Sequence, residues 1–186
     1  MDIKNKEFII TKLAYESVTT PFDCGDADLN DFLVNDALTY QNERLAVTHL
    51  LKCRDNENEL IAGYFCLLTD KLMFDPSNDN QRKIWKLFNK RNKIHFKKHR
   101  KSYPAIKIGR LAIAKIFAGE GLGRYLINQI LGEIINIDSI ACRFITVDAY
   151  RNAFNFYLKN GFDFLSSDDE NDTTRAMYLD IKRLII

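Results

Sequence analysis

The stretch FAGEGLGRYL holds three glycines within five consecutive residues: Gly119, Gly121 and Gly123. It lies between an apolar run and a segment with helical periodicity. Glycine leaves backbone amides unshielded, and the N-terminus of a helix adds partial positive charge to those amides. An anion such as a pyrophosphate group fits such a site. The stretch therefore predicts a phosphate-binding turn at the start of a helix. A purely structural tight turn is the alternative.

Two well-known phosphate-binding loops do not fit this stretch. A Walker loop ends in Gly-Lys followed by Ser or Thr, whereas here Arg124 and Tyr125 follow Gly123. A dinucleotide-binding fingerprint that begins at Gly119 needs glycine or alanine at Arg124. The turn is thus neither of these motifs.

A second candidate is the basic segment between Arg82 and Lys101, which holds ten Lys or Arg and no acid. The remaining residues carry 17 bases against 25 acids, so the net charge of +2 conceals one strongly basic region. Aromatic and histidine side chains alternate with these charges, a composition that suits a phosphate-rich partner. The alternative is a solvated basic helix whose apolar residues only anchor it in the core: Ile84, Trp85, Leu87 and Phe88.

Size and composition predict one folded domain. The chain has 186 residues, of which 46% are hydrophobic and 12% aromatic, enough for a core. No apolar run approaches the roughly 18 residues that span a bilayer, and the first residues do not resemble a signal peptide, so we expect a cytoplasmic protein without membrane contact. Cys24, Cys53, Cys66 and Cys142 lack CxxC spacing, so we expect buried free thiols, no metal site and no disulfide framework.

Hydrophobic periodicity places these candidates on an alternation of strands and helices. Strands are expected at 7–13, 47–53, 59–70, 105–113, 142–148 and near 162–165 and 176–184, and helices at 26–43, 79–91, 121–135 and 150–160. The helix at 79–91 and a following basic loop form an insertion over about 71–103. The run at 142–148 is apolar on both faces, which is typical of a buried central strand.

Four segments together resemble the GCN5-related N-acetyltransferase (GNAT) family over most of residues 104–165: GRLAI, the G-x-G-x-G turn, the strand ending in VDA, and AFNFYLKNGF. The resemblance implies an α/β fold, with a mixed sheet of about six to seven strands flanked by helices on both faces, in a single domain over 1–186. It also implies acetyl-CoA as the acyl donor.

In that family the turn binds the pyrophosphate of acetyl-CoA through backbone amides, and the preceding strand pairs with the pantetheine arm. By position, the pantetheine-pairing residues are Leu111, Ala112 and Ile113, and amides near Ile113 would stabilise the oxyanion. The pyrophosphate-binding residues are Ala118, Gly119, Glu120, Gly121, Leu122, Gly123 and Arg124. The family usually has Gln or Arg at the position of Ala118, so this chain lacks one side-chain contact.

The resemblance also implies a general acid. Tyr157 lies in the family's A-x-x-F-Y-x-x-x-G-F pattern, where the tyrosine returns a proton to the leaving thiolate. A phenol with a pKa of about 10 is protonated at neutral pH and can do so. The alternative role is an aromatic plug between helix and sheet. The asparagine that often precedes this tyrosine by seven residues is replaced by Tyr150, and Asn152 is the nearby candidate for that contact with the coenzyme.

The amino-terminal PFDCGDADLNDFL and the later YPAIKIGRLAI resemble a subgroup, the acetyltransferase toxins of toxin–antitoxin pairs, which acetylate aminoacyl-tRNA. An α-amine has a pKa near 7.7–8.0 and is already partly neutral, whereas a lysine amine near 10.4 needs a base. Only Asp70, His95 and His99 are candidate bases, and none is convincing, which favours an α-amine acceptor.

The sequence thus predicts an N-acetyltransferase that acts by direct attack of the amine on the thioester. Its candidate acceptor is charged tRNA, and its candidate partner an antitoxin. The candidate RNA-binding residues are Arg91, Lys93, Lys97, Lys98 and Arg100. Acetylation of a small amine or of a protein N-terminus is one alternative, and a non-catalytic module that binds CoA or nucleic acid is another. A homodimer through the sheet edge or the insertion is compatible with the sequence.

Overall fold

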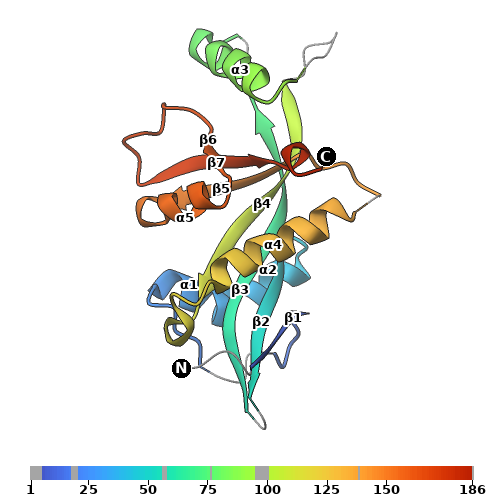
Figure 1. Ribbon diagram of the computed structural model, residues 1–186, viewed down its shortest axis with the longest axis vertical. Coiled ribbons are helices and arrows are strands. Elements are labelled where there is room, and N and C mark those ends of the chain that lie inside the picture. Colours follow the sequence, from blue (N-terminus) through green and yellow to red (C-terminus); the bar gives the residue numbers. More distant parts are fainter. Residues whose placement is uncertain are drawn as a thin grey trace. The chain divides into compact units, whose positions relative to one another are not determined.

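The computed structural model describes residues 6–17, 21–55, 58–75, 77–94, 101–137 and 139–185. Its seven strands form one mixed sheet in the order β1-β2-β3-β4-β5-β7-β6, flanked by helices (Figure 1). The strands are β1 (Glu7–Lys12), β2 (Val47–Asp55), β3 (Asn58–Met73), β4 (Ser102–Ile113), β5 (Phe144–Tyr150), β6 (Asp163–Phe164) and β7 (Thr174–Asp180). The helices are α1 (Ala27–Asp31), α2 (Ala37–Asn42), α3 (Asp79–Arg91), α4 (Leu122–Ile135) and α5 (Phe154–Lys159). The predicted fold class is confirmed.

Contacts divide the chain into two compact units. The first unit comprises Met1–Leu68 and Ile108–Ile130, and the second comprises Thr69–Lys107 and Leu131–Ile186. Strands β3 and β4 and helix α4 pass from one unit into the other. The organisation of 1–186 as a single domain stays a prediction.

In the first unit a helical run packs on the β2–β3 hairpin. Strands β1, β2 and β3 are antiparallel, with a register shift in β2 between Leu51 and Lys52. The side chain of Asp26 caps α1 by accepting from the Leu29 amide at 3.1 Å. The Tyr64 hydroxyl of β3 donates to the Leu29 carbonyl at 2.7 Å. The helix predicted at 26–43 is present as a helical run over α1 and α2. A π-helical segment, Phe32–Asp36, separates these two helices.

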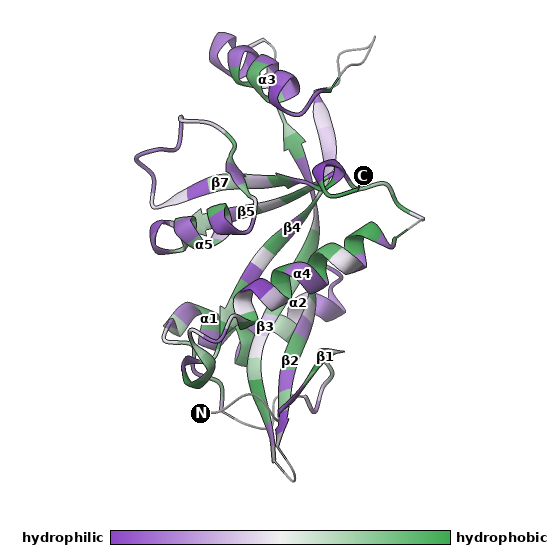
Figure 2. Ribbon diagram, in the orientation of Figure 1, coloured by the Kyte–Doolittle hydropathy of each residue, from purple (hydrophilic) through white to green (hydrophobic). Residues whose placement is uncertain are grey.

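In the second unit α3 covers an aromatic core. The Asn78 side chain caps α3 by accepting from the amides of Asn80 and Gln81, and Phe88 is 3% exposed. The core around Phe88 comprises Leu72, Phe74, Ile94, Tyr103, Ala105, Phe144 and Tyr178, with Ile84 and Trp85 packed against it. Hydrophilic residues predominate in α3, with fewer hydrophobic ones between them (Figure 2). Leu87 is 67% exposed, so the proposed anchoring of this residue in the core is wrong.

Strand β5 is central, as predicted. It runs parallel to β4, with Ala105 opposite Phe144, and antiparallel to β7. Its residues 144–147 are all buried. Strand β7 ends at Asp180, earlier than predicted, because the Asp180 side chain caps a 3₁₀ turn, Ile181–Arg183, by accepting from the Lys182 amide at 3.1 Å. All four cysteines are free, but Cys24 and Cys142 are only partly buried.

Candidate functional site

The end of β4, where Leu111, Ala112 and Ile113 lie, is held closely against β3. The Ala114 amide donates to the Ala62 carbonyl at 2.9 Å. A Cβ atom on Gly63 would lie 2.7 Å from the Ala112 carbonyl oxygen, so only glycine allows this approach. The ladder between β4 and β5 spans Ala105–Lys107, in the first half of β4. The predicted pantetheine-pairing residues therefore lie beyond that ladder.

The chain leaves β4 through a 3₁₀ turn, Lys115–Phe117, which is anchored to the loop before α1. The backbone amide of Lys115 donates to the Asp23 carbonyl at 2.8 Å. The ammonium group of the Lys115 side chain pairs with the Asp23 carboxylate at 2.9 Å. The Lys115 side chain and the Gly25 amide hold the pKa of Asp23 below its usual value. Phe117 is fully buried. The contacts of Lys115 with Asp23 and the burial of Phe117 thus fix the segment that leads into the glycine turn.

The glycine turn itself is open and rich in unshielded amides. Gly119 and Gly121 have φ of +84° and +78°, and a Cβ atom on either would meet no atom within 4 Å. Positive φ, and not crowding, therefore explains these glycines. The Gly121 carbonyl accepts from the Tyr125 amide at 3.0 Å. The amides of Leu122–Arg124 precede this bond and have no acceptor within the helix, so they can donate to an anion. Ala118, Glu120 and Arg124 are exposed, Gly123 is partly exposed and Leu122 is buried.

Tyr157 lies on α5 and is 6% exposed. Its ring contacts Phe156 and Phe162, with centroids 5.0 and 5.2 Å away. Burial raises the pKa of the Tyr157 phenol well above its usual value of 10, which keeps it protonated. Within the described ranges no side chain or backbone group hydrogen-bonds to its hydroxyl. Both roles weighed from the sequence, plug and proton donor, are compatible with this environment.

The structure also places the weaker candidates. Tyr150, at the end of β5, is 54% exposed, and Asn152 is exposed in the 3₁₀ turn Arg151–Ala153. Asp70 accepts a hydrogen bond from the Thr146 hydroxyl at 2.5 Å, and β3 continues past it to Met73. Five candidates lie outside the described residues: His95, Lys97, Lys98, His99 and Arg100.

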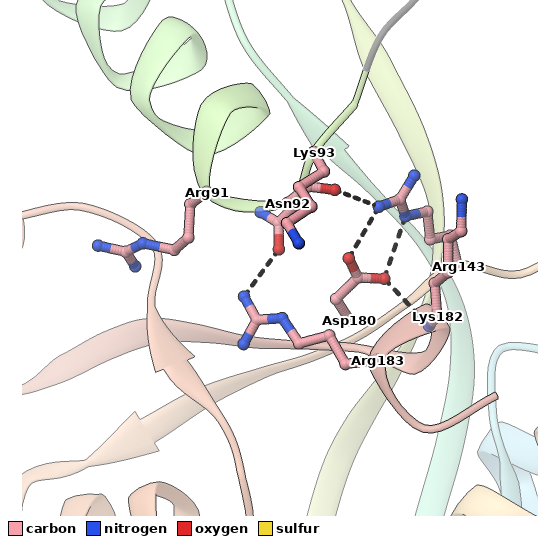
Figure 3. Close-up of a pocket in the computed structure, with 7 residues that line it drawn as sticks. All are labelled: Arg91, Asn92, Lys93, Arg143, Asp180, Lys182 and Arg183. Carbon is pink, nitrogen blue, oxygen red and sulfur yellow. Dashed lines mark hydrogen bonds and ion pairs between the residues drawn. The ribbon is translucent and has the colours of Figure 1, made fainter. Parts of the chain in front are cut away.

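A basic pocket in the second unit brings together residues that the sequence did not connect. The cavity, of about 390 Å³, is lined by Arg91, Asn92, Lys93, Arg143, Asp180, Lys182 and Arg183 (Figure 3). Arg91 and Lys93 are predicted site residues at the end of α3. The sequence did not predict the other three cations, Arg143, Lys182 and Arg183. They lie in segments whose pattern indicates a strand and no binding site. Five of the lining side chains are cations and one is a carboxylate.

Hydrogen bonds fix the inner part of this pocket (Figure 3). Arg143 binds the Asp180 carboxylate and also donates to the Asn92 carbonyl at 2.7 Å. Arg183 donates to the Asn92 side-chain oxygen at 2.8 Å and pairs with the Asp163 carboxylate at 2.8 Å. Burial acts to lower the pKa of Arg183, but Asp163, Tyr178 and Asp180 together raise that pKa above its usual value. The pocket is therefore a preformed feature of the fold.

Comparison with known proteins identifies the family. A family model described as an acetyltransferase (GNAT) domain matches residues 78–181, more than half of the chain. The chain belongs to the GNAT acetyltransferase family. The predicted activity is thereby confirmed, and this GNAT protein is an N-acetyltransferase that uses acetyl-CoA as its donor. Within the described residues no helix is long and apolar enough to cross a membrane.

Solved structures resemble this GNAT protein over nearly its whole length. A tyrosine-to-phenylalanine mutant of KacT has a TM-score of 0.72 at 22% identity, covering 96% of this chain and 97% of that one. A bacterial toxin has a TM-score of 0.72 at 17% identity, with 95% and 93% covered. AtaT complexed with acetyl-methionyl-tRNAfMet has a TM-score of 0.69 at 23% identity, with 96% and 98% covered. At these identities the similarity establishes a common fold. No curated protein matches the sequence significantly.

Proposed function

We propose that this GNAT protein transfers the acetyl group of acetyl-CoA to the α-amine of an aminoacyl-tRNA, in the cytoplasm, as the toxin of a toxin–antitoxin pair. The observation that carries the proposal is the similarity over 96% of the chain to AtaT complexed with acetyl-methionyl-tRNAfMet. A structure of AtaT bound to the C-terminus of the antitoxin AtaR, which covers 96% of this chain at a TM-score of 0.65, supports an antitoxin partner.

The glycine turn is the proposed site for the pyrophosphate of acetyl-CoA. The space beside Gly119 and Gly121 is open. The amides of Leu122–Arg124 lie in the first turn of α4, where the helix offers them no acceptor. These donors, together with the dipole of α4, favour a doubly charged diphosphate. Because the β5 ladder ends at Lys107, the backbone of Leu111–Ile113 is available to pair with the pantetheine arm.

The reaction proposed is direct attack of the amine on the thioester. The amine nitrogen forms a bond to the acetyl carbon, and the Ile113 amide stabilises the negative charge on the carbonyl oxygen. Collapse breaks the bond between carbon and sulfur, and Tyr157 gives its proton to the departing thiolate. The acceptor amine loses one proton to water, and solvent returns a proton to Tyr157 before the next turnover. An α-amine needs no strong base at neutral pH, which is consistent with the engagement of Asp70 by Thr146.

Labelled acetyl-CoA tests this function directly. The protein is incubated with labelled acetyl-CoA and aminoacylated bulk tRNA, and the label in acid-precipitable RNA is counted before and after mild alkaline cleavage of the ester. We expect label that is released from RNA as acetyl-amino acid, and about a hundredfold less with Tyr157→Phe. Label only in metabolites or protein would assign a different acceptor, and no thiol release with any amine would indicate a silent binding module.

A further inference from the structure

The rim of the basic pocket carries cations that no carboxylate of the described residues neutralises. Arg143 is paired with Asp180, and Arg183 with Asp163. Over the described ranges, Arg91, Lys93 and Lys182 form no ion pair with any carboxylate. The Arg91 guanidinium donates a long hydrogen bond, of 3.5 Å, to the Phe164 carbonyl. Three cations therefore line one cavity whose only described carboxylate, Asp180, is already paired with Arg143, and this arrangement favours an anionic ligand.

The inner wall of the pocket holds this geometry rigidly. Asn92 is 4% exposed, and its side chain bonds to the Phe88 carbonyl, Tyr178 and Arg183. Asp180 is 2% exposed and accepts from Arg143 and from the Lys182 amide. Lys93 follows the end of α3 with φ of +48°, a left-handed conformation that L-residues adopt infrequently. Such a conformation turns the chain sharply beside the pocket. Hydrogen bonds thus hold the inner wall of the pocket before any ligand binds.

We propose that this pocket binds a phosphate group of the RNA acceptor and so helps to hold the tRNA, with residues that take no part in the thioester chemistry. The inference rests on the proposed function and deepens it. Lysine and arginine donors around a cavity of about 390 Å³ suit a phosphodiester, whose oxygens accept several charge-assisted hydrogen bonds. Contacts of this kind position a nucleic acid but do not read its sequence. The pocket therefore contributes equally to different tRNAs.

The adenosine phosphates of acetyl-CoA have the same chemistry, so they are the alternative ligand for this pocket. The proposed function already assigns the pyrophosphate of acetyl-CoA to the amides around Gly121, in the first unit. The basic pocket lies entirely in the second unit, within which the excess of bases is concentrated at Arg82–Lys101. A polyanion engages such an extended basic region better than a single coenzyme does. The kinetic experiment below separates the two sources.

Salt-dependent binding of deacylated tRNA tests the pocket. The dissociation constant is measured by fluorescence anisotropy between 50 and 200 mM KCl for wild type and for Arg91→Gln, Lys93→Asn and Lys182→Gln. Asparagine replaces Lys93 because it tolerates positive φ. Each substitution is expected to reduce the slope of log K against log salt by about one. The control is Lys12→Gln, which removes an exposed cation of β1 and should leave the slope unchanged.

Steady-state kinetics of the triple variant identify the source of the phosphate. We expect a KM for charged tRNA raised at least tenfold, an unchanged KM for acetyl-CoA, and an unchanged rate with an amino-acid methyl ester, which has no phosphate. A raised KM for acetyl-CoA with tRNA binding unaffected would overturn the proposal, as would an unchanged salt slope in a variant with wild-type Tm. If wild type binds tRNA through the pocket but does not acetylate it, the proposed function fails while the pocket assignment stands.

Discussion

Arg143 holds the carboxylate of Asp180 through two hydrogen bonds, Nε to Oδ1 at 3.0 Å and Nη2 to Oδ2 at 2.8 Å. Asp180 is 2% exposed, so Arg143 and the Lys182 amide take the place of water as its hydrogen-bond donors. We expect Arg143→Met to lower the free energy of unfolding by about 3–5 kcal/mol, because it leaves a buried carboxylate unpaired. Urea unfolding measures this loss.

A second substitution separates the lost charge pair from lost packing. Asp180→Asn in the Arg143→Met background removes the unpaired charge but keeps an oxygen that can accept from the Lys182 amide. The double variant should therefore recover part of the lost stability, as a double-mutant cycle reports. If Arg143→Met alone unfolds within about 0.5 kcal/mol of wild type, the ion pair does not stabilise the pocket.

The approach of β3 to the end of β4 predicts different costs for two glycine substitutions. In Gly63→Ala the new methyl group would meet the Ala112 carbonyl at 2.7 Å, and backbone cannot move without distorting the strand. In Gly109→Ala it would meet the side chains of Leu68 and Cys66 at 2.8 and 2.9 Å, which can rotate away. We expect Gly63→Ala to cost about 1–3 kcal/mol of stability, and Gly109→Ala less. Equal costs in thermal unfolding would contradict this.

The glycine turn predicts a binding defect without a large folding defect. In Gly121→Val the side chain has room, but a φ of +78° costs a valine about 1–2 kcal/mol, so the turn should shift and withdraw its amides. Calorimetric titration should show acetyl-CoA affinity reduced about tenfold or more, which corresponds to 1.4 kcal/mol. The control, Gly132→Ala inside α4, should raise stability by about 1 kcal/mol and leave affinity unchanged. Wild-type affinity in Gly121→Val would remove the turn from the donor site.

Tyr157→Phe tests the proton donor. The substitution keeps the ring that packs between Phe156 and Phe162 and removes only the hydroxyl. We expect kcat to fall about a hundredfold or more, with acetyl-CoA affinity unchanged. Tyr150→Phe, at an exposed position, serves as the control and should retain kcat. A plug without a catalytic role would instead leave kcat of Tyr157→Phe at the wild-type level.

Burial of two phenols predicts how stability changes at high pH. Burial raises the pKa of Tyr157 and, more strongly, that of Tyr64 above the usual 10. Above pH 10 the unfolded chain releases these protons while the folded chain retains them. The free energy of unfolding should then fall as pH rises, and it should be fully retained below pH 10. Urea unfolding from pH 8 to 11 should show a shallower fall in Tyr157→Phe, and an equal fall would mean that this phenol ionises freely in the folded protein.

Several elements could be predicted from the sequence because their signals are local. The bounds of α3, Asp79–Arg91, agree with its apolar spacing, and β2 and β3 contain the strands expected at 47–53 and 59–70. The glycine turn precedes α4 as expected, since positive φ at Gly119 and Gly121 is a property of neighbouring residues alone. These signals, with the family motifs, were sufficient for the fold class and the acetyl transfer activity.

The basic pocket is a product of the tertiary structure alone. Asn92 contacts Arg143 and Arg183, which lie 51 and 91 residues away along the chain, because β5 and β7 pair in one particular register. The same applies to Gly63, whose need for glycine arises from the backbone of β4. Residue types and periodicity act over a few neighbours, so they cannot tell which distant cations share a cavity or which of them already have a carboxylate partner. Packing of the sheet decides both.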